Sequence, residues 1–382
     1  MSARNEYLLV GAGLFNAVLA HELHAAGKKV RVIEERAHVG GNCFTRIERG
    51  IVVHEHGPHV FHTNDGGVWD FVRKFGRFHR FVYNAKALNN GALYSLPVNM
   101  NTFTEVWGMG TCTPAEAADR LRQQTANYQS LTADNVEALA LRTLGPQLYG
   151  LLIKDYTEKM WGRKAAQVPA EILRRIPVRY TYDNDYFSDA FEGIPDDGYT
   201  PIIKRMLRGV RVEHGTFTRR DYKRAYRAIV YTGSVDRYWE YKLGVLPYRS
   251  LYITSHEGTS DNLGVVAVNH TDNEDTRTRT IQHELFDPRS AARYHESIVT
   301  HEVPCQWRPG QSEQLGLSPL YPMRGMDGSD ALYARYLKKS AGNHNLYFKG
   351  RLGEYLYLNM DQVVRRALDF AQELLHYPRR NP

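Results

Sequence analysis

Two glycines and an acid near the N-terminus have the types and spacing that bind a dinucleotide. Residues 11–16 read Gly-Ala-Gly-Leu-Phe-Asn, between an apolar run and a segment of helical composition. Gly11 permits a tight turn, and Gly13 lets the backbone approach a pyrophosphate at the positive end of the helix. Glu34 ends a second apolar run about twenty residues later, where a carboxylate accepts hydrogen bonds from a ribose. The order of strand, helix, strand and acid predicts a bound dinucleotide, although the glycines alone also fit a chance turn.

Two further loops bear on which dinucleotide binds. Arg36 and the loop Gly40-Gly41-Asn42 follow the acid, within reach of the same phosphates. Proteins that bind FAD in an extended conformation often have an Arg and a Gly-Gly loop here, whereas NAD domains rarely need one. A third apolar run, 228–231, ends in Thr232-Gly233. That pair alone is an ordinary strand-end turn, but together the three loops favour FAD over NAD.

Composition bounds the class of protein. The chain has 382 residues and a net charge of +7, enough length for more than one domain. No apolar stretch approaches the roughly 18–20 residues that span a membrane, and the start has no signal-peptide core. Cys43, Cys112 and Cys305 are few and far apart, which predicts reduced thiols, no metal and a cytoplasmic protein. The basic run 219–227 fits a solvated helix better than a nucleic-acid patch.

The pattern changes along the chain predict separate layers. Residues 113–175 have helical spacing, 180–304 alternate as strands do, and 360–375 form a final helix. The N-terminus of that helix, near Asn359, would stabilise the anionic edge of a reduced flavin. The predicted fold is α/β: a Rossmann-like FAD-binding domain assembled from separated segments, a helical insertion and an antiparallel β-sheet domain. The boundaries are 1–80, 192–242 and 318–382 for the FAD domain, 98–178 for the helical insertion, and 81–97, 179–191 and 243–317 for the sheet domain.

Ordered blocks along the chain resemble one family, the flavin-dependent UDP-galactopyranose mutases of bacterial type. Tyr156-Thr157-Glu158-Lys159-Met160-Trp161-Gly162 is the most specific block. Others, in chain order, are 11–15, 40–42, 57–64, 99–103, 175–180, 183–187, 193–195, 248–251 and 350–352. A series of blocks in the same order is far more specific than any single motif.

The resemblance implies an isomerisation with no net redox change. Family members interconvert UDP-galactopyranose and UDP-galactofuranose, which supplies galactofuranose for cell-surface glycans. N5 of the reduced FAD attacks the anomeric carbon, UDP leaves, and the ring recloses through another hydroxyl. An external reductant such as NAD(P)H would prime the flavin. The resemblance also implies a homodimer that binds no nucleic acid and spans no membrane.

The resemblance also implies site residues. Arg175 and Arg279 would hold the leaving diphosphate, because a guanidinium fork binds phosphate in a bidentate manner. His62 belongs to a loop against the flavin and is placed with the catalytic group without an acid–base role. The substrate-binding residues would be Tyr156, Trp161, Asn84, Tyr186, Asn269, Tyr321 and Tyr357, with Trp161 against the uracil. The cofactor-binding residues would be Gly11, Gly13, Leu14, Phe15, Glu34, Glu35, Arg36, Gly41, Asn42, His59, Thr232, Gly233, Arg351, Asn359 and Met360.

Three positions depart from the family pattern: Asn16 replaces a third glycine, Met160 a frequent Gln, and Asn359 an acid. We expect Asn16 to tilt the first helix slightly from its strand and the asparagines to weaken or shift cofactor contacts. Two other functions stay open. An amine-oxidase-like FAD oxidoreductase shares the FAD unit but does not need Trp161 and the two arginines. A binding protein without turnover is the other alternative.

Overall fold

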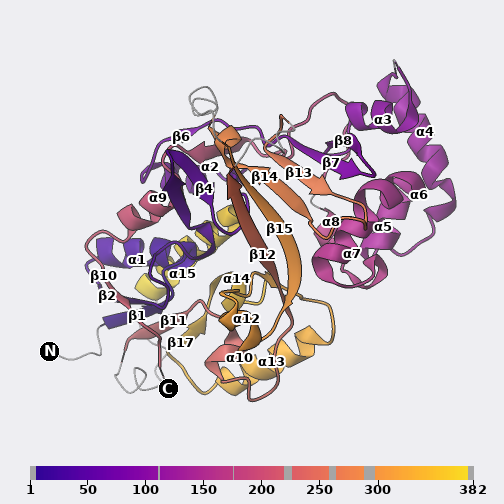
Figure 1. The fold of residues 1–382 in the computed structure, drawn as a ribbon. Coiled ribbons are helices and arrows are strands. Elements are labelled where there is room, and N and C mark those ends of the chain that lie inside the picture. The colour runs from indigo at the N-terminus through magenta and orange to yellow at the C-terminus, as the bar shows by residue number, and fades with distance from the viewer. Residues whose placement is uncertain are drawn as a thin grey trace.

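The computed structural model describes residues 6–110, 112–174, 176–218, 226–257, 264–287 and 297–376 (Figure 1). Two main sheets and a helical lobe make up the molecule, with the long strands β12 (Tyr248–Glu257) and β15 (Ile298–Trp307) running through its middle. None of the helices within the described ranges has the length and apolar character needed to cross a bilayer. The predicted helix around 219–227 falls mostly on residues outside these ranges.

A five-stranded parallel sheet contains the glycine turn. Its order is β10 (Arg211–His214), β2 (Lys29–Glu34), β1 (Glu6–Val10), β11 (Ala228–Tyr231) and β17 (Leu346–Phe348). The neighbours pair in parallel, so that strands from the start, middle and end of the chain lie side by side. Leu8 and Leu9 are fully buried because apolar side chains cover both faces of the central strand.

Helices pack on one face of this sheet. α1 (Leu14–Ala25) lies against α15 (Met360–His376), and α9 (Tyr199–Met206) packs on the other side of α1. α2 (Gly66–Arg73) adds Val68 and Phe71 to the same core. The crossover from β1 through α1 to β2 is the unit predicted from the sequence, and the final helix lies where it was expected.

A second sheet of seven strands joins the two halves of the molecule. Its order is β16 (Tyr321–Pro322), β12, β15, β14 (Arg279–Gln282), β13 (Ala267–His270), β7 (Ala85–Asn89) and β8 (Ala92–Leu96). All pairs are antiparallel except β13 with β7. The strand expected over 264–268 begins only at Ala267. The sheet is therefore mixed, with a mainly antiparallel pattern.

The helical lobe covers the β7–β8 end of this sheet (Figure 1). Asn99 caps its first helix, and Thr113, Pro114 and Glu116 form the start of the next one. Leu148 and Leu152 are buried in its core. The helices are α3 (Met100–Trp107), α4 (Pro114–Thr125), α5 (Val136–Thr143), α6 (Gly145–Leu148), the π-helix η4 (Tyr149–Lys154), α7 (Asp155–Trp161) and α8 (Glu171–Arg174).

Short elements complete the connections. Strands β5 (Phe61–Thr63), β9 (Phe191–Pro195) and β6 (Phe78–His79) form one small sheet, and β3 (Thr45–Glu48) pairs with β4 (Ile51–His54). One longer helix, α13 (Ser329–Ser340), also belongs to these connections. The short helical turns are η2 (Gly41–Cys43), η3 (Ala126–Tyr128), η5 (Ala165–Gln167), α10 (Val235–Tyr238), η7 (His283–Phe286), α12 (Gln311–Gln314) and α14 (Gly350–Gly353). Cys43, Cys112 and Cys305 are free thiols, and burial raises the pKa of Cys43 to about 11.

Candidate active site

The glycine turn is as tight as the sequence predicted. Gly11 has a φ of 94°, a conformation that favours glycine, and its N–H donates to the Ile33 carbonyl at 2.8 Å. A Cβ at this position would collide with Oγ1 of Thr232. Thr232 is held there because its hydroxyl donates to the Val10 carbonyl at 2.8 Å. Gly13 is the N-cap of α1 and provides no side chain to bond the first amides of the helix. Those amides are therefore available to an anion.

The second glycine loop closes over the first. The N–H of Gly40 donates to the Ala12 carbonyl at 2.8 Å, and Gly40 also forms a bridge with Gly13. A Cβ on Gly41 would lie 3.0 Å from Cα of Gly13. Asn42 follows in the same turn and is half-buried. The two loops thus form one backbone cradle without side chains in its floor.

The acidic end of β2 braces this cradle. The Glu34 carboxylate accepts from the N–H of Ala12 at 2.6 Å and from the N–H of Arg36 at 2.8 Å. Glu35 pairs with Arg237 at 2.8 Å. The Arg36 guanidinium donates to Ser318 Oγ at 2.9 Å through Nη2, whereas its buried Nη1 has no partner among the described residues.

Asn16 behaves differently from our expectation. The side chain is fully buried, and Nδ2 donates to the carbonyls of Val10 at 3.0 Å and Gly11 at 2.9 Å. Instead of tilting the helix away, the amide ties α1 to the end of β1. A third glycine would leave these two carbonyls without this donor.

The N-terminus of α15 lies next to the segment 57–64, which contains His59 and His62 and is called the histidine loop below. Arg351, on α14, donates to the Leu358 carbonyl at 2.6 Å, just before Asn359 and Met360 begin the helix. The Asn359 N–H donates to Gln362 Oε1 at 3.1 Å. Thr63 donates to the Asp361 carboxylate at 3.3 Å, which joins β5 to the first turn of α15.

Two histidines of this loop have different surroundings. His59 is held by its ring bond to the Gly57 carbonyl at 2.7 Å. Burial, together with the positive charges of Arg351 and Arg279, lowers the pKa of His59 to about 4. His62 pairs through Nδ1 with Asp189 at 2.5 Å and stacks on Phe187, with 3.8 Å between ring centroids.

Arg279 lies in a row of three polar side chains that crosses the second sheet. It pairs with Asn269 on β13 and with Glu302 on β15, and directly opposite residues share one face of a sheet. Its Nε lies 3.4 Å from Glu302 Oε2, and its Nη2 donates to Tyr156 Oη at 3.4 Å. Glu302 is 1% exposed, and a Cβ on Gly57 would lie 2.8 Å from its Oε1. The buried carboxylate of Glu302 therefore lies between Arg279 on β14 and Gly57 of the histidine loop.

An aromatic cluster joins the two ends of the site. Tyr321 and Tyr357 stack at 5.7 Å, and the Arg351 guanidinium lies 5.1 Å from the Tyr357 ring. Trp161 meets the edges of both tyrosines at 6.4 Å and is only 3% exposed. Tyr156, five residues earlier on α7, is half-buried. The indole of Trp161, which was predicted to lie against the uracil, is therefore more enclosed than Tyr156.

Two further predicted residues lie next to Tyr83, Tyr186 in space and Asn84 in the chain. Tyr186 packs edge-to-face on Tyr83 at 5.6 Å. Asn84 has a buried Oδ1 with no partner among the described residues. Burial raises the pKa of Tyr83, while the charge of Arg279 opposes that shift. Arg175 lies outside the described residues.

Sequence reasoning missed two residues of this site. Glu302 was missed because a lone acid in an alternating strand is usually solvated. The sequence around Glu302, residues 298–307, contains no pattern that marks this acid as buried. Lys159 was quoted within a motif and given no role. Its ammonium instead donates to three backbone carbonyls of the β13–β14 loop.

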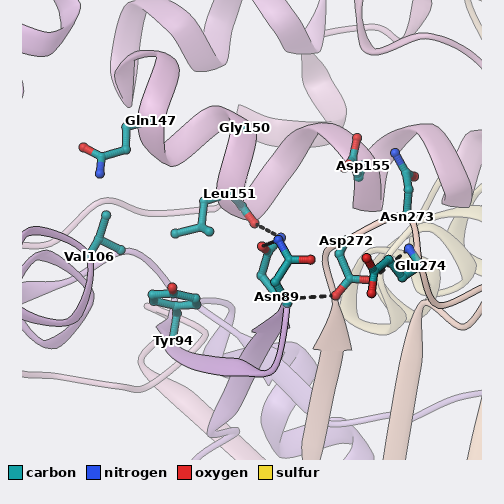
Figure 2. A pocket seen from close by; sticks show the side chains of 11 residues that line it. Asn89, Tyr94, Val106, Gln147, Gly150, Leu151, Asp155, Asp272, Asn273 and Glu274 are labelled. Carbon is teal, nitrogen blue, oxygen red and sulfur yellow. Dashed lines mark hydrogen bonds between the residues drawn. The ribbon is translucent and has the colours of Figure 1, made fainter.

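A pocket of about 550 Å³ lies beside this site, between the β7–β8 hairpin and the helical lobe (Figure 2). None of the predicted site residues lines it. Asn89 donates to the Leu151 carbonyl at 3.0 Å, and the N–H of Asn90 donates to Asp272 at 3.0 Å (Figure 2). The first bond joins the hairpin to the helical lobe, and the second fixes one side of the β13–β14 loop.

Comparisons with known proteins agree on one family. The family model for UDP-galactopyranose mutase matches residues 151–357, and that for an NAD(P)-binding Rossmann-like domain matches residues 9–75. A dTDP-fucopyranose mutase of Escherichia coli is 33% identical, with 96% of this chain and 98% of that protein covered. A "probable UDP-galactopyranose mutase" of Klebsiella pneumoniae is 34% identical over 96% of this chain and 94% of its own length.

Solved structures share the fold. A reduced UDP-galactopyranose mutase superposes with a TM-score of 0.70 at 13% identity, covering 97% of this chain and 95% of that one. A CLA-producing fatty acid isomerase from P. acnes gives a TM-score of 0.58 at 14% identity, covering 98% and 99%. Since different activities occur on this fold, the fold alone does not decide the reaction.

Proposed function

The chain belongs to the UDP-galactopyranose mutase family of isomerases, and we propose that it interconverts UDP-galactopyranose and UDP-galactofuranose with FAD in the glycine cradle. The observation that supports this most is that arginines border the aromatic residues of the site on two sides. Arg351 lies 5.1 Å from the Tyr357 ring, and Arg279 donates to Tyr156 at 3.4 Å. A nucleotide sugar between them would meet both a cofactor and a diphosphate clamp. The product would supply galactofuranose for cell-surface glycans.

The residues of the cradle fit FAD. Gly11, Gly13 and Gly41 leave no side-chain atoms where a pyrophosphate would approach, and α1 begins without a side-chain cap. The buried Nη1 of Arg36 offers a free donor at the same place. Glu34, Arg351 and the start of α15 would hold the ribose and the flavin end. Reduced flavin, when bound, supplies the nucleophile for the anomeric carbon, and an external reductant would maintain its reduced state.

Arg279 would stabilise the departing diphosphate. Its side chain is half-buried beside Glu302, with 20% exposed, and the carboxylate keeps the pKa of the arginine raised although burial lowers it. It therefore stays charged in a half-buried site, where its interaction with developing negative charge is stronger than in open water. Arg175 would add a second cation by family resemblance.

Tyr156 suits the uracil better than Trp161 does. An aromatic face binds a planar base only where the face is open. Trp161 is enclosed by Tyr321 and Tyr357, whereas Tyr156 is half-buried next to Arg279. We therefore assign base stacking to Tyr156 and give Trp161 the role of supporting the two tyrosines.

The other assignments rest on resemblance and position. Asn84, Asn269 and Tyr186 would contact the sugar or the diphosphate, and His62 would lie against the flavin, oriented by Asp189. The three predicted domains would follow the two main sheets and the helical lobe. A cytoplasmic homodimer is part of the same proposal.

One experiment separates the candidate substrates and activities. The flavin-loaded protein is reduced and given UDP-galactopyranose or dTDP-fucopyranose, because a relative of each kind matches the chain equally well. Chromatography that finds the UDP-furanose supports the proposal. Conversion of dTDP-fucopyranose alone would identify that nucleotide sugar as the substrate in place of UDP-galactopyranose. Oxidation of an amine or alcohol, with no furanose formed, would favour the oxidoreductase.

A further inference from the structure

The ammonium of Lys159 donates all of its hydrogen bonds to the loop between β13 and β14. It donates to the carbonyls of His270, Asp275 and Arg277, each at 2.9 Å. A lysine ammonium has three N–H groups, so no donor remains for a ligand. The carbonyl partners are neutral backbone groups, which makes this a geometric tie.

The tied loop carries the arginine of the site. It connects β13, which ends at His270, to β14, which begins at Arg279. Two of the three bonded carbonyls therefore lie at the two ends of the hairpin loop, next to the pair Asn269–Arg279. On the far side, Asn90 holds Asp272 (Figure 2).

Lys159 itself lies on the helix that presents the aromatic residues. Tyr156 is three residues earlier on α7, and its hydroxyl accepts from Arg279 Nη2 at 3.4 Å. The end of α7 is fixed from the same sheet, since buried Arg249 donates to the carbonyls of Met160 at 2.7 Å and Lys159 at 2.9 Å. α7 is thus tied to the second sheet at two places, the β13–β14 loop through Lys159 and β12 through Arg249.

We propose that Lys159 is a positioning residue that sets the separation between the base-stacking ring on α7 and the diphosphate-binding Arg279. This rests on the proposed function. A nucleoside diphosphate spans both groups, so its affinity depends on their spacing. A ligand that uses only one of them does not sense the spacing. In catalysis, a displacement of about 1 Å between positioned groups can lower the reaction rate roughly a hundredfold.

The test compares ligands as well as variants, all on the flavin-loaded protein. In Lys159→Met the alkyl chain remains and the three donors are lost. UDP binding by calorimetry should weaken at least about tenfold, and KM for the UDP-sugar should rise more than kcat falls. Uridine binding, followed by ligand-observed NMR, should change less than about twofold. Lys164→Met is the matched control, because Lys164 is a largely exposed lysine near the same helix whose ammonium pairs with Glu158, and the variant should bind both ligands as the parent does.

Several results would overturn the inference. Unchanged UDP affinity in Lys159→Met contradicts it, and so does an equal loss for UDP and uridine, which indicates general damage. If that variant does not fold, Lys159→Arg keeps the charge but points a planar fork at three convergent carbonyls. It should still bind UDP at least about threefold more weakly, and parental affinity would refute the geometric role. Parental protein that binds no UDP instead refutes the proposed function.

Discussion

The buried histidines predict that the protein loses stability as the pH falls below neutrality. His56, His59 and His283 have pKa values lowered to about 3, about 4 and about 3, mainly by burial and further by nearby positive charge. In the unfolded chain each returns to the ordinary value of 6.5. Between those values the unfolded state binds more protons than the folded state. Acid therefore favours unfolding, and the stability present above pH 6.5 is lost as the pH falls through that window.

The size of the loss follows from the proton binding. At pH 5.5 an unfolded histidine is about nine-tenths protonated and the buried ones are almost neutral, which costs about 1.4 kcal/mol each relative to pH 7.5. Three such groups give about 4 kcal/mol of the free energy of unfolding. Buried His54 and His270, whose pKa values are also lowered, add to this. The carboxyl of Glu192 opposes part of the loss, because burial and the nearby Asp185 raise its pKa to about 8. The folded state then binds a proton that the unfolded state does not, so acid favours folding at this one group. Carboxylates with lowered pKa values titrate below this window.

Urea unfolding at pH 7.5 and pH 5.5 measures the effect. His56→Asn should remove about one third of the three-histidine loss, about 1.4 kcal/mol, whatever it does to the absolute stability. His344→Asn is the control, because His344 is exposed. A free energy of unfolding that is the same at both pH values would refute the reasoning, as would an equal pH dependence in both variants and the parent.

Three further predictions concern the site. Arg279→Ala should lower kcat/KM roughly a hundredfold to a thousandfold while the flavin spectrum stays, because the diphosphate loses this half-buried cation; activity near the parental level would remove the clamp assignment. Gly11→Ala should lose flavin on gel filtration, since the Cβ meets Thr232 and φ is 94°; full flavin content would show that the turn does not need glycine. Asn16→Gly should lower the free energy of unfolding by roughly 2–3 kcal/mol, from two lost hydrogen bonds and a helical glycine; a more stable variant would contradict the tie between α1 and β1.

Local patterns predicted the cofactor half of the fold well. The turn at Gly11, the helix after it and the acid at Glu34 follow from short-range sequence rules, and the structure contains each of them. The final helix was also placed from its spacing. The prediction that Asn16 tilts the first helix was wrong. The rule that expects glycine at this position does not consider that a side-chain amide can donate to the carbonyls of Val10 and Gly11.

The substrate half depended on contacts that local patterns do not encode. Glu302 and Arg279 are 23 positions apart and meet only because β14 and β15 pair in one register. Lys159 reaches a loop more than a hundred residues away. Trp161 was assigned to the uracil by resemblance, yet its burial depends on Tyr321 and Tyr357, which come from far along the chain. Long-range pairing therefore determines the surroundings of these side chains.

The proposed isomerisation needs reduced flavin and consumes no reductant. UDP-galactofuranose formation is followed by chromatography, with the protein first oxidised and then reduced by dithionite under anaerobic conditions. We expect many turnovers per reduced flavin and none in the oxidised protein. Turnover without reduction, or one reductant consumed per product, would contradict it.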